Sequence, residues 1–161
     1  MSQVYISIGS NIEKEKNIPS AIRSLEATFG NMELSSLYLC ESLGFDGPDF
    51  YNMVVKIETD KTVEELVFIC KQMELDHGRD ENAKKFTPRP LDLDILLYDD
   101  QIMETPALIP RPEIKEYAFV LWPLAEIAGD KQHPVCQSSF NDLWLHFDAS
   151  NQKIEQKPFK F

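Results

Sequence analysis

The segment Leu91–Leu97, LDLDILL, constrains the fold more than any other part of this 161-residue chain. Its residues alternate in character, and alternate residues of a β-strand point to opposite faces of a sheet. One face carries four apolar side chains and is predicted to pack in the core: Leu91, Leu93, Ile95 and Leu97. Asp92 and Asp94 share the other face, with Cα atoms about 6.5–7 Å apart. The chain is therefore expected to contain a sheet that holds two carboxylates side by side.

The rest of the chain predicts an α+β fold, in which a mostly antiparallel sheet is covered by helices. Alternation and β-branched residues predict strands over residues 4–8, 34–42, 52–58 and 91–98, with a short return at 101–103. Helical spacing predicts helices over residues 19–29, 62–77 and 117–127, and a last one after Ser139 with little chain beyond it. Pro19 suits a first helical turn, and Thr62 with Glu65 forms a capping box. Helices are too few for a doubly wound parallel sheet. The length of 161 residues suits one domain, which is expected to cover residues 1–161.

Charge and composition exclude several classes of protein. The chain has 27 acidic and 16 basic residues, a net charge of -11, whereas binders of nucleic acid or anionic membranes need a basic surface. No apolar run approaches the roughly 18 residues of a membrane span. The first residues lack the pattern of a secretory signal, so a cytoplasmic location is expected. Cys40, Cys70 and Cys136 are widely spaced and predict reduced thiols rather than disulfides or a zinc site.

The carboxylate pair predicts metal-dependent phosphate chemistry. Two carboxylates this close repel each other unless a positive group joins them, and Mg²⁺ is typically held by one or two carboxylates plus substrate phosphates. Arg89 lies three residues before Asp92. A guanidinium can donate two parallel hydrogen bonds to phosphate oxygens. Arg79 adds positive charge nearby. One alternative stays open from the residues alone, namely that Asp92 and Asp94 form the solvated outer face of an edge strand.

Several motifs, taken in order, resemble the 6-hydroxymethyl-7,8-dihydropterin pyrophosphokinase family. They are GSN after the first strand, DFYN at 49–52, ELDHGR at 74–79, PRPLDLDILLY at 88–98 and FVLWPLAEI at 119–127. The resemblance implies a ferredoxin-like core and transfer of the β,γ-diphosphate of ATP to the pterin hydroxymethyl oxygen, giving AMP, in folate biosynthesis. It implies ATP and a hydroxymethyl-dihydropterin as small-molecule substrates of a monomer, with two Mg²⁺ ions and without nucleic acid or membrane partners.

The resemblance also implies roles for particular residues. Asp92 and Asp94 match the aspartates that hold the two Mg²⁺ ions. The residues expected at the transferring phosphates, and counted as catalytic with these aspartates, are Arg79 and Arg89. Those expected at the nucleotide are Glu74, Ile95 and Arg111. Those expected at the pterin are Leu43, Gly44, Phe50, Asn52 and Phe119.

Simpler interpretations of these residues stay open. Phe50 and Phe119 would also suit plain core packing, Asn52 a turn cap, and Glu74 a solvated helix end. His77 immediately precedes the Gly78-Arg79 turn and is a candidate for contact with the site.

The chain departs from the family pattern among its cations. Arg111 stands where the family commonly has histidine, Tyr117 and Glu81 stand where it has arginines, and Phe86 stands where it has tryptophan. Lys84, Lys85 and Lys115 are candidate replacements for the lost charge. Two other functions therefore remain in view. One is a diverged paralogue that binds pterin with weak or altered transfer, and the other is a non-catalytic binding module.

Overall fold

The computed structural model describes residues 1–42, 47–78 and 89–158. Its strands are β1 (Ser2–Ser10), β2 (Glu33–Leu34), β3 (Leu37–Cys40), β4 (Phe50–Thr59), β5 (Asp92–Tyr98) and β6 (Ile154–Lys157). Its α-helices are α1 (Lys14–Phe29), α2 (Val63–Asp76), α3 (Ala118–Ala128) and α4 (Phe140–Leu145), and a 3-10 turn covers Pro112–Lys115. Within these ranges, no helix has the length and apolar character that crossing a bilayer requires.

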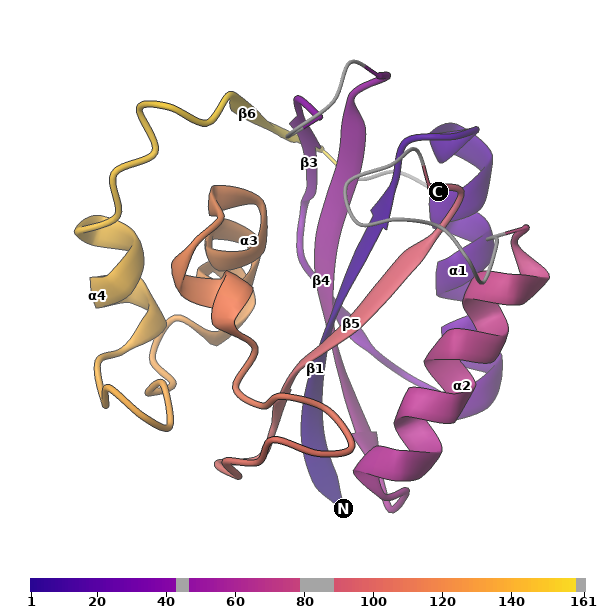
Figure 1. The fold of residues 1–161 in the computed structure, drawn as a ribbon, viewed down its shortest axis with the longest axis horizontal. Helices are drawn as coiled ribbons and strands as arrows, with labels where there is room; N and C mark the ends of the chain where they lie inside the picture. Colours follow the sequence, from indigo (N-terminus) through magenta and orange to yellow (C-terminus); the bar gives the residue numbers. More distant parts are fainter. Residues whose placement is uncertain (43–46, 79–88, 159–161) are drawn as a thin grey trace.

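The sheet has the strand order β5-β1-β4-β3-β6, with β2 also paired to β4, and every paired neighbour is antiparallel. In Figure 1, α1 and α2 lie against one face of the sheet, α3 lies against the other, and α4 lies outside α3. The order β5-β1-β4-β3, reached through a β-α-β-β-α-β chain path, is ferredoxin-like. The predicted α+β architecture is confirmed.

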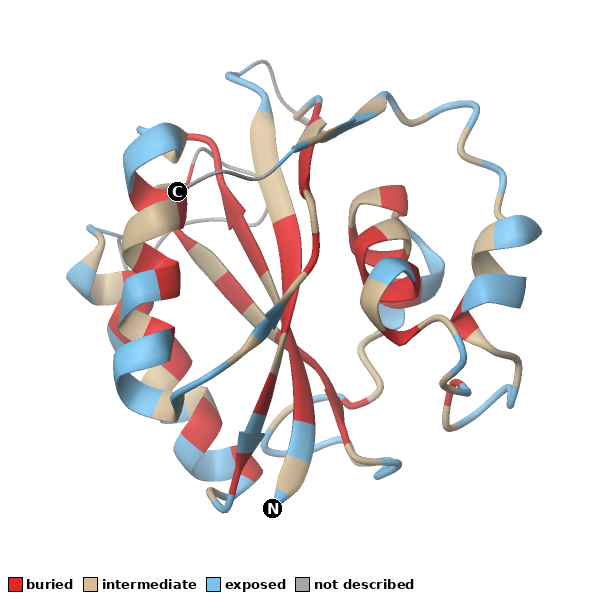
Figure 2. Ribbon diagram, turned by 180° about the vertical axis from the view of Figure 1, so that it is seen from behind, coloured by how far each residue is buried: buried red, intermediate tan, exposed pale blue. Residues whose placement is uncertain are grey.

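Two apolar cores lie on opposite faces of the sheet. One fills the space between the sheet and α1 and α2, and includes Ile6, Leu25 and Leu66. The other lies under α3 and includes Val54, Leu121 and Phe140. Figure 2 shows the buried sides of the helices turned toward the sheet. The faces of β5 are therefore both enclosed, although β5 is an edge strand of the sheet.

A β-bulge in β5 corrects the predicted orientation of Leu97. Ile6 pairs with Ile95 and Tyr5 pairs with Leu97, so Leu96 is an extra residue with no counterpart on β1. An extra residue reverses the alternation beyond it. Leu91, Leu93 and Ile95 pack toward α1 and α2 as predicted, but Leu97 packs under α3. Asp92 and Asp94 precede the bulge and keep the predicted shared face.

Three local boundaries differ from the predictions. Helix α1 begins at Lys14, so Pro19 lies in its second turn rather than its first. The expected strand 34–42 is divided at Ser35 and Ser36, because the Ser36 N–H donates to the Glu126 carboxylate instead of a neighbouring strand. The expected return at 101–103 is a single bridge between Met103 and Ile109. The capping box that begins α2 is formed as predicted.

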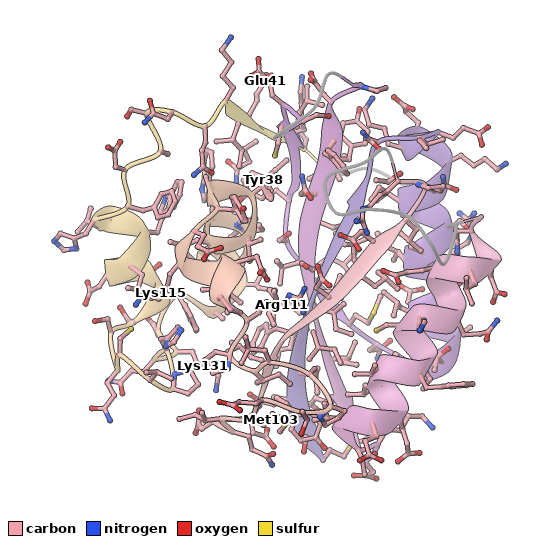
Figure 3. All side chains as sticks on the ribbon, viewed as in Figure 1. Tyr38, Glu41, Met103, Arg111, Lys115 and Lys131 are labelled. Atoms are coloured by element: carbon pink, nitrogen blue, oxygen red, sulfur yellow. The ribbon has the colours of Figure 1, made fainter. Side chains whose placement is uncertain are left out.

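The C-terminal strand β6 is a further correction, since little structure was expected after the last helix. It pairs with β3 from Leu37 to Cys40. Tyr38, labelled in Figure 3, connects three elements: its hydroxyl donates to Glu126 of α3 at 2.7 Å and accepts from Gln156 of β6 at 3.0 Å. Strand β3, which leads toward the candidate site, is thereby held from two sides.

Candidate active site

A cavity of about 710 Å³ surrounds the edge strand β5. Asp92 and Asp94 line it from the face under α3, whereas Leu93 and Ile95 line it from the face toward α2. Residues of α2, including Lys71 and Glu74, form one wall, and Phe119 and Val120 of α3 contribute to the other. The volume lies in the range of small-molecule sites, which is about 300–1,000 Å³.

A row of residues across three strands forms the floor of this cavity. Asp92 pairs with Gly9, and Gly9 pairs with Asn52, so all three belong to the same face of the sheet. A Cβ atom placed on Gly9 would lie 2.9 Å from the Asn52 Oδ1 atom. The absence of a side chain at Gly9 leaves room for the Asn52 amide, which lies over the β1 backbone.

The Asn52 amide has a defined orientation, set by Cys40. Its Nδ2 atom lies 3.4 Å from the Cys40 Sγ atom, and that thiol is directed at the Tyr38 carbonyl oxygen at 3.9 Å. Burial raises the pKa of the Cys40 thiol to about 12, so it stays protonated and donates to the carbonyl while accepting from Asn52. The Oδ1 atom of Asn52 is consequently presented over Gly9. Asn52 lies within β4 and caps no turn.

Each aspartate of the predicted pair lies beside an arginine. Asp92 Oδ1 is 3.6 Å from Arg89 Nη1, and Asp94 Oδ1 is 3.2 Å from Arg111 Nη2. The aspartate side chains are only 33% and 32% exposed, which differs from a fully solvated outer face. The site therefore alternates two negative and two positive groups, an arrangement suited to binding phosphates together with cations.

Arg89 is held in place by Asn11, which the sequence analysis identified only as part of the GSN motif. The Asn11 N–H donates to the Arg89 carbonyl at 3.0 Å, and the Arg89 N–H donates to Asn11 Oδ1 at 2.6 Å. Asn11 also donates from Nδ2 to the Pro48 carbonyl at 3.2 Å. The GSN motif thus fixes the backbone that carries Arg89, whose side chain is only 10% exposed.

Arg111 reaches the site from the segment that leads to α3 (Figure 3). Its backbone N–H donates to the carbonyl of Leu96, the bulge residue, at 3.0 Å. Its Nε atom lies 2.6 Å from Glu113 Oε2, a close ion pair without the alignment of a hydrogen bond. The sequence did not identify Glu113 as a residue of the site, although both Arg111 and Glu113 line the cavity.

Glu74 is buried at the end of α2 rather than solvated. Its side chain accepts a hydrogen bond from the Leu93 N–H at 2.8 Å. Leu93 lies on the edge strand, between the two aspartates in sequence. Glu74 therefore stabilises the position of the strand that carries Asp92 and Asp94, in addition to lining the cavity.

The remaining predicted residues divide into three groups. Phe50 and Phe119 are half-buried and line the cavity, and Tyr117 lines it where the family has arginine. His77 lies outside the lining, because its ring bonds to Ser20 and to the Met73 carbonyl and so joins α2 to α1. Lys115 also lies outside the lining, near enough to His133 to lower its pKa further after burial has lowered it. The predicted residues that lie outside the described ranges are Leu43, Gly44, Arg79, Glu81, Lys84, Lys85 and Phe86.

The donor set fits magnesium better than a softer metal. Among the described residues, no group of three or more His, Cys, Asp or Glu side chains is placed to hold a metal ion. A two-carboxylate site suits Mg²⁺, which completes its octahedron with water and substrate phosphates. Asp92 and Asp94 could supply that pair.

A model of the family described as 7,8-dihydro-6-hydroxymethylpterin-pyrophosphokinase matches residues 5–129. The chain belongs to this family. It is therefore a pyrophosphokinase, an ATP-dependent diphosphotransferase of folate synthesis, as the motif resemblance implied. Strand β6 lies beyond the matched residues.

Individual relatives agree with the family assignment. The chain is 35% identical over 146 residues to 2-amino-4-hydroxy-6-hydroxymethyldihydropteridine pyrophosphokinase of Aquifex aeolicus, covering 89% of this chain and 91% of that protein. It is 39% identical over 128 residues to the enzyme of that name from Bacillus subtilis, covering 76% of each. It is also 40% identical over 136 residues to the folic acid synthesis protein fol1 of Pneumocystis carinii, of which it spans only 18%.

Solved structures confirm the fold. A Plasmodium falciparum HPPK-DHPS structure matches 90% of this chain with a TM-score of 0.69 and 12% sequence identity. A second HPPK-DHPS structure, solved in complex with substrates, matches 89% with a TM-score of 0.71. The chain spans 43% of the length of each of these larger proteins.

Proposed function

We propose that this pyrophosphokinase carries out its transfer in the cavity around β5, moving the β,γ-diphosphate of ATP to the hydroxymethyl oxygen of 6-hydroxymethyl-7,8-dihydropterin. One observation carries the proposal. Asp92 and Asp94, each beside an arginine, share a sheet face and a cavity with the Asn52 amide. The cavity therefore holds charged side chains that suit phosphates and an amide that suits a polar ring, close enough for ATP and a pterin to bind side by side.

The pterin is proposed to bind on the floor formed by Gly9 and Asn52. The Asn52 Oδ1 atom accepts from the amino or ring N–H groups of the pterin, and Gly9 leaves space for the Asn52 amide in this orientation. Phe50 and Phe119 supply apolar surface for its two flat faces. Leu43 and Gly44, outside the described residues, are proposed to contribute backbone contacts to the ring edge.

The nucleotide is proposed to bind along the other part of the cavity. Glu74 and Ile95 line that part together with Pro106, which gives it an apolar surface with one carboxylate. Arg111 lines the same cavity beside Asp94 and is placed to contact phosphate oxygens. Arg79 is proposed as a further phosphate ligand.

The transfer needs positioning and charge stabilisation more than covalent chemistry by the protein. The substrate hydroxyl oxygen attacks the β-phosphorus of ATP, the bond from that phosphorus to the α-phosphate oxygen breaks, and the hydroxyl proton is lost as AMP leaves. Asp92 and Asp94 would hold magnesium, which neutralises phosphate charge when bound. Arg89, fixed through Asn11, stabilises the charge on the transferring group.

We further propose that two magnesium ions bind, and that the chain acts as a single-domain monomer in the cytoplasm. Asp92 and Asp94 supply two neighbouring carboxylates, which supports the binding of two magnesium ions. The single sheet with a core on each face supports one domain.

Release of AMP tests the proposed function. Purified protein is incubated with ATP, Mg²⁺ and 6-hydroxymethyl-7,8-dihydropterin, and AMP is measured by chromatography. Reactions without pterin, and reactions with excess chelator, are the controls. Pterin-dependent AMP release is expected, and AMP that forms equally without pterin would contradict the proposal.

A diverged enzyme with slow transfer is the second candidate, because Tyr117 lines the cavity where the family has a cation and Arg111 is engaged with two carboxylates. The same assay separates the two candidates when pterin binding is measured alongside it. Tight pterin binding with little AMP release would favour divergence.

A further inference from the structure

Arg111 and Arg89 contact the two aspartates in different ways. The Arg89 side chain is 10% exposed and its backbone is fixed by the reciprocal bonds to Asn11. The Arg111 side chain is 32% exposed, although its backbone is restricted by flanking prolines and by the bond to the Leu96 carbonyl. The guanidinium of Arg111 is therefore freer to move than that of Arg89, while the Arg111 backbone stays near Asp94.

The Arg111 side chain is shared between two carboxylates. Nη2 lies 3.2 Å from Asp94 Oδ1, and Nε lies 2.6 Å from Glu113 Oε2. Both of the atoms in the Glu113 contact are buried, and neither has an aligned hydrogen bond. Glu113 thus holds the near end of the guanidinium independently of Asp94.

A divalent cation at Asp94 would compete with this guanidinium. Mg²⁺ binds carboxylate oxygens at about 2.0–2.1 Å. A Mg²⁺ ion on the Asp94 carboxylate would therefore lie close to the positive charge of Arg111. Two cations so close repel each other strongly where little water screens them. Metal binding at Asp94 therefore favours movement of Arg111 away from this carboxylate, and Glu113 offers Arg111 a second anionic partner inside the cavity.

We propose that Arg111 is a displaceable counter-ion of Asp94, and that Glu113 is the positioning residue that keeps the displaced guanidinium in the cavity. This rests on the proposed assignment of Asp94 as a metal ligand. Before metal binds, Arg111 neutralises Asp94. After metal binds, Arg111 remains on Glu113 and is available to the phosphates of the nucleotide.

The test measures Mn²⁺ binding to the protein without nucleotide, by calorimetry or by the electron paramagnetic resonance signal of free Mn²⁺. Arg111→Met removes the competing charge and is expected to tighten Mn²⁺ binding by about tenfold. Glu113→Gln leaves Arg111 with Asp94 as its anionic partner, and is expected to weaken Mn²⁺ binding. A purely structural contribution of the two residues would instead weaken binding in both variants.

Two matched variants control for general charge effects. Lys71→Met removes a cation, and Glu41→Gln removes an anion, from other parts of the cavity lining. Both are expected to change Mn²⁺ affinity less than the corresponding variants of Arg111 and Glu113. In a protein that carries Asp94→Asn, adding Arg111→Met is expected to leave the affinity for Mn²⁺ unchanged.

The double variant decides whether Glu113 acts through Arg111. If it does, Glu113→Gln has no further effect when Arg111→Met is already present. An equal loss in both backgrounds would overturn the positioning role. Unchanged or weaker Mn²⁺ binding in Arg111→Met, including the case in which neither protein binds Mn²⁺, would overturn the counter-ion role. Neither result depends on AMP release, so failure here is distinguishable from failure of the proposed function.

Discussion

The substitution Gly9→Ala is expected to separate folding from pterin binding. The added Cβ atom would lie 2.9 Å from Asn52 Oδ1 and 3.9 Å from both Asn52 Cγ and Phe50 Cδ1. The one severe contact involves the end of a side chain, which turns away at small cost. Alanine also loses less backbone entropy on folding than glycine, by about 0.5–1 kcal/mol, which offsets part of the strain. The melting temperature is therefore expected to change by only a few degrees.

Pterin binding is expected to weaken much more than stability. An Asn52 amide pushed off Gly9 leaves its contact with Cys40 and no longer presents Oδ1 to the ring. A polar ligand group left without its hydrogen bond in a closed site costs about 1–3 kcal/mol, or about 5- to 150-fold in the dissociation constant. The affinity for ATP in the absence of pterin should stay unchanged, because the nucleotide part of the cavity lies away from Gly9.

The assay is a titration with 6-hydroxymethylpterin, followed by its fluorescence, in the presence of Mg²⁺ and a non-hydrolysable ATP analogue. Wild type, Gly9→Ala, Asn52→Ala and the double variant form a cycle. If Gly9 acts through Asn52, the double variant binds no more weakly than Asn52→Ala alone. Wild-type affinity in Gly9→Ala, or an equal loss in both backgrounds, would refute the reasoning.

Three further variants and one reagent provide the remaining tests. Asp92→Ala and Asp94→Ala should each abolish Mg²⁺-dependent AMP release with the circular dichroism spectrum intact, and near wild-type release in either would refute the metal assignment. Glu74→Ala should lower stability by about 1–3 kcal/mol and lower turnover, because the β5 N–H that bonds to Glu74 is left without this acceptor; the loss should show in urea unfolding. Iodoacetamide near neutral pH should modify exposed Cys136 well before Cys40, whose pKa is raised by burial from 9.0 to about 12, and mass spectrometry reports the order. The same shift stabilises the fold below pH 9, and that contribution should decline as the pH rises toward 12 in thermal melts.

The sequence predicted the parts of this protein that depend on local periodicity. Alternation placed Asp92 and Asp94 on one face, and the structure keeps that face because the strand is regular up to Ile95. The prediction for Leu97 was wrong because the bulge adds one residue, and LDLDILL has no glycine or other local sign of it. The capping box was predictable because both partners lie within one helical turn.

Contacts between distant segments were not predictable in the same way. Nothing in residues 154–157 marks a strand by itself, and β6 is ordered by its pairing with β3. The contact of Arg111 with Asp94 depends on how the segment before α3 docks on the bulge. The bond from Leu93 to Glu74 depends on the packing of α2 against β5.

The way the cavity passes around a free sheet edge also bears on how such an enzyme can change over generations. Because the described residues place no strand beyond β5, the two halves of the cavity meet at its edge yet are built from different sides of the strand. Substitutions at Lys71 or Pro106 alter the half toward α2, whereas substitutions at Cys40 or Phe119 alter the half under α3. The preference for a nucleotide base and the preference for a pterin ring can therefore change independently during evolution, while Asp92 and Asp94 keep their positions between the two halves.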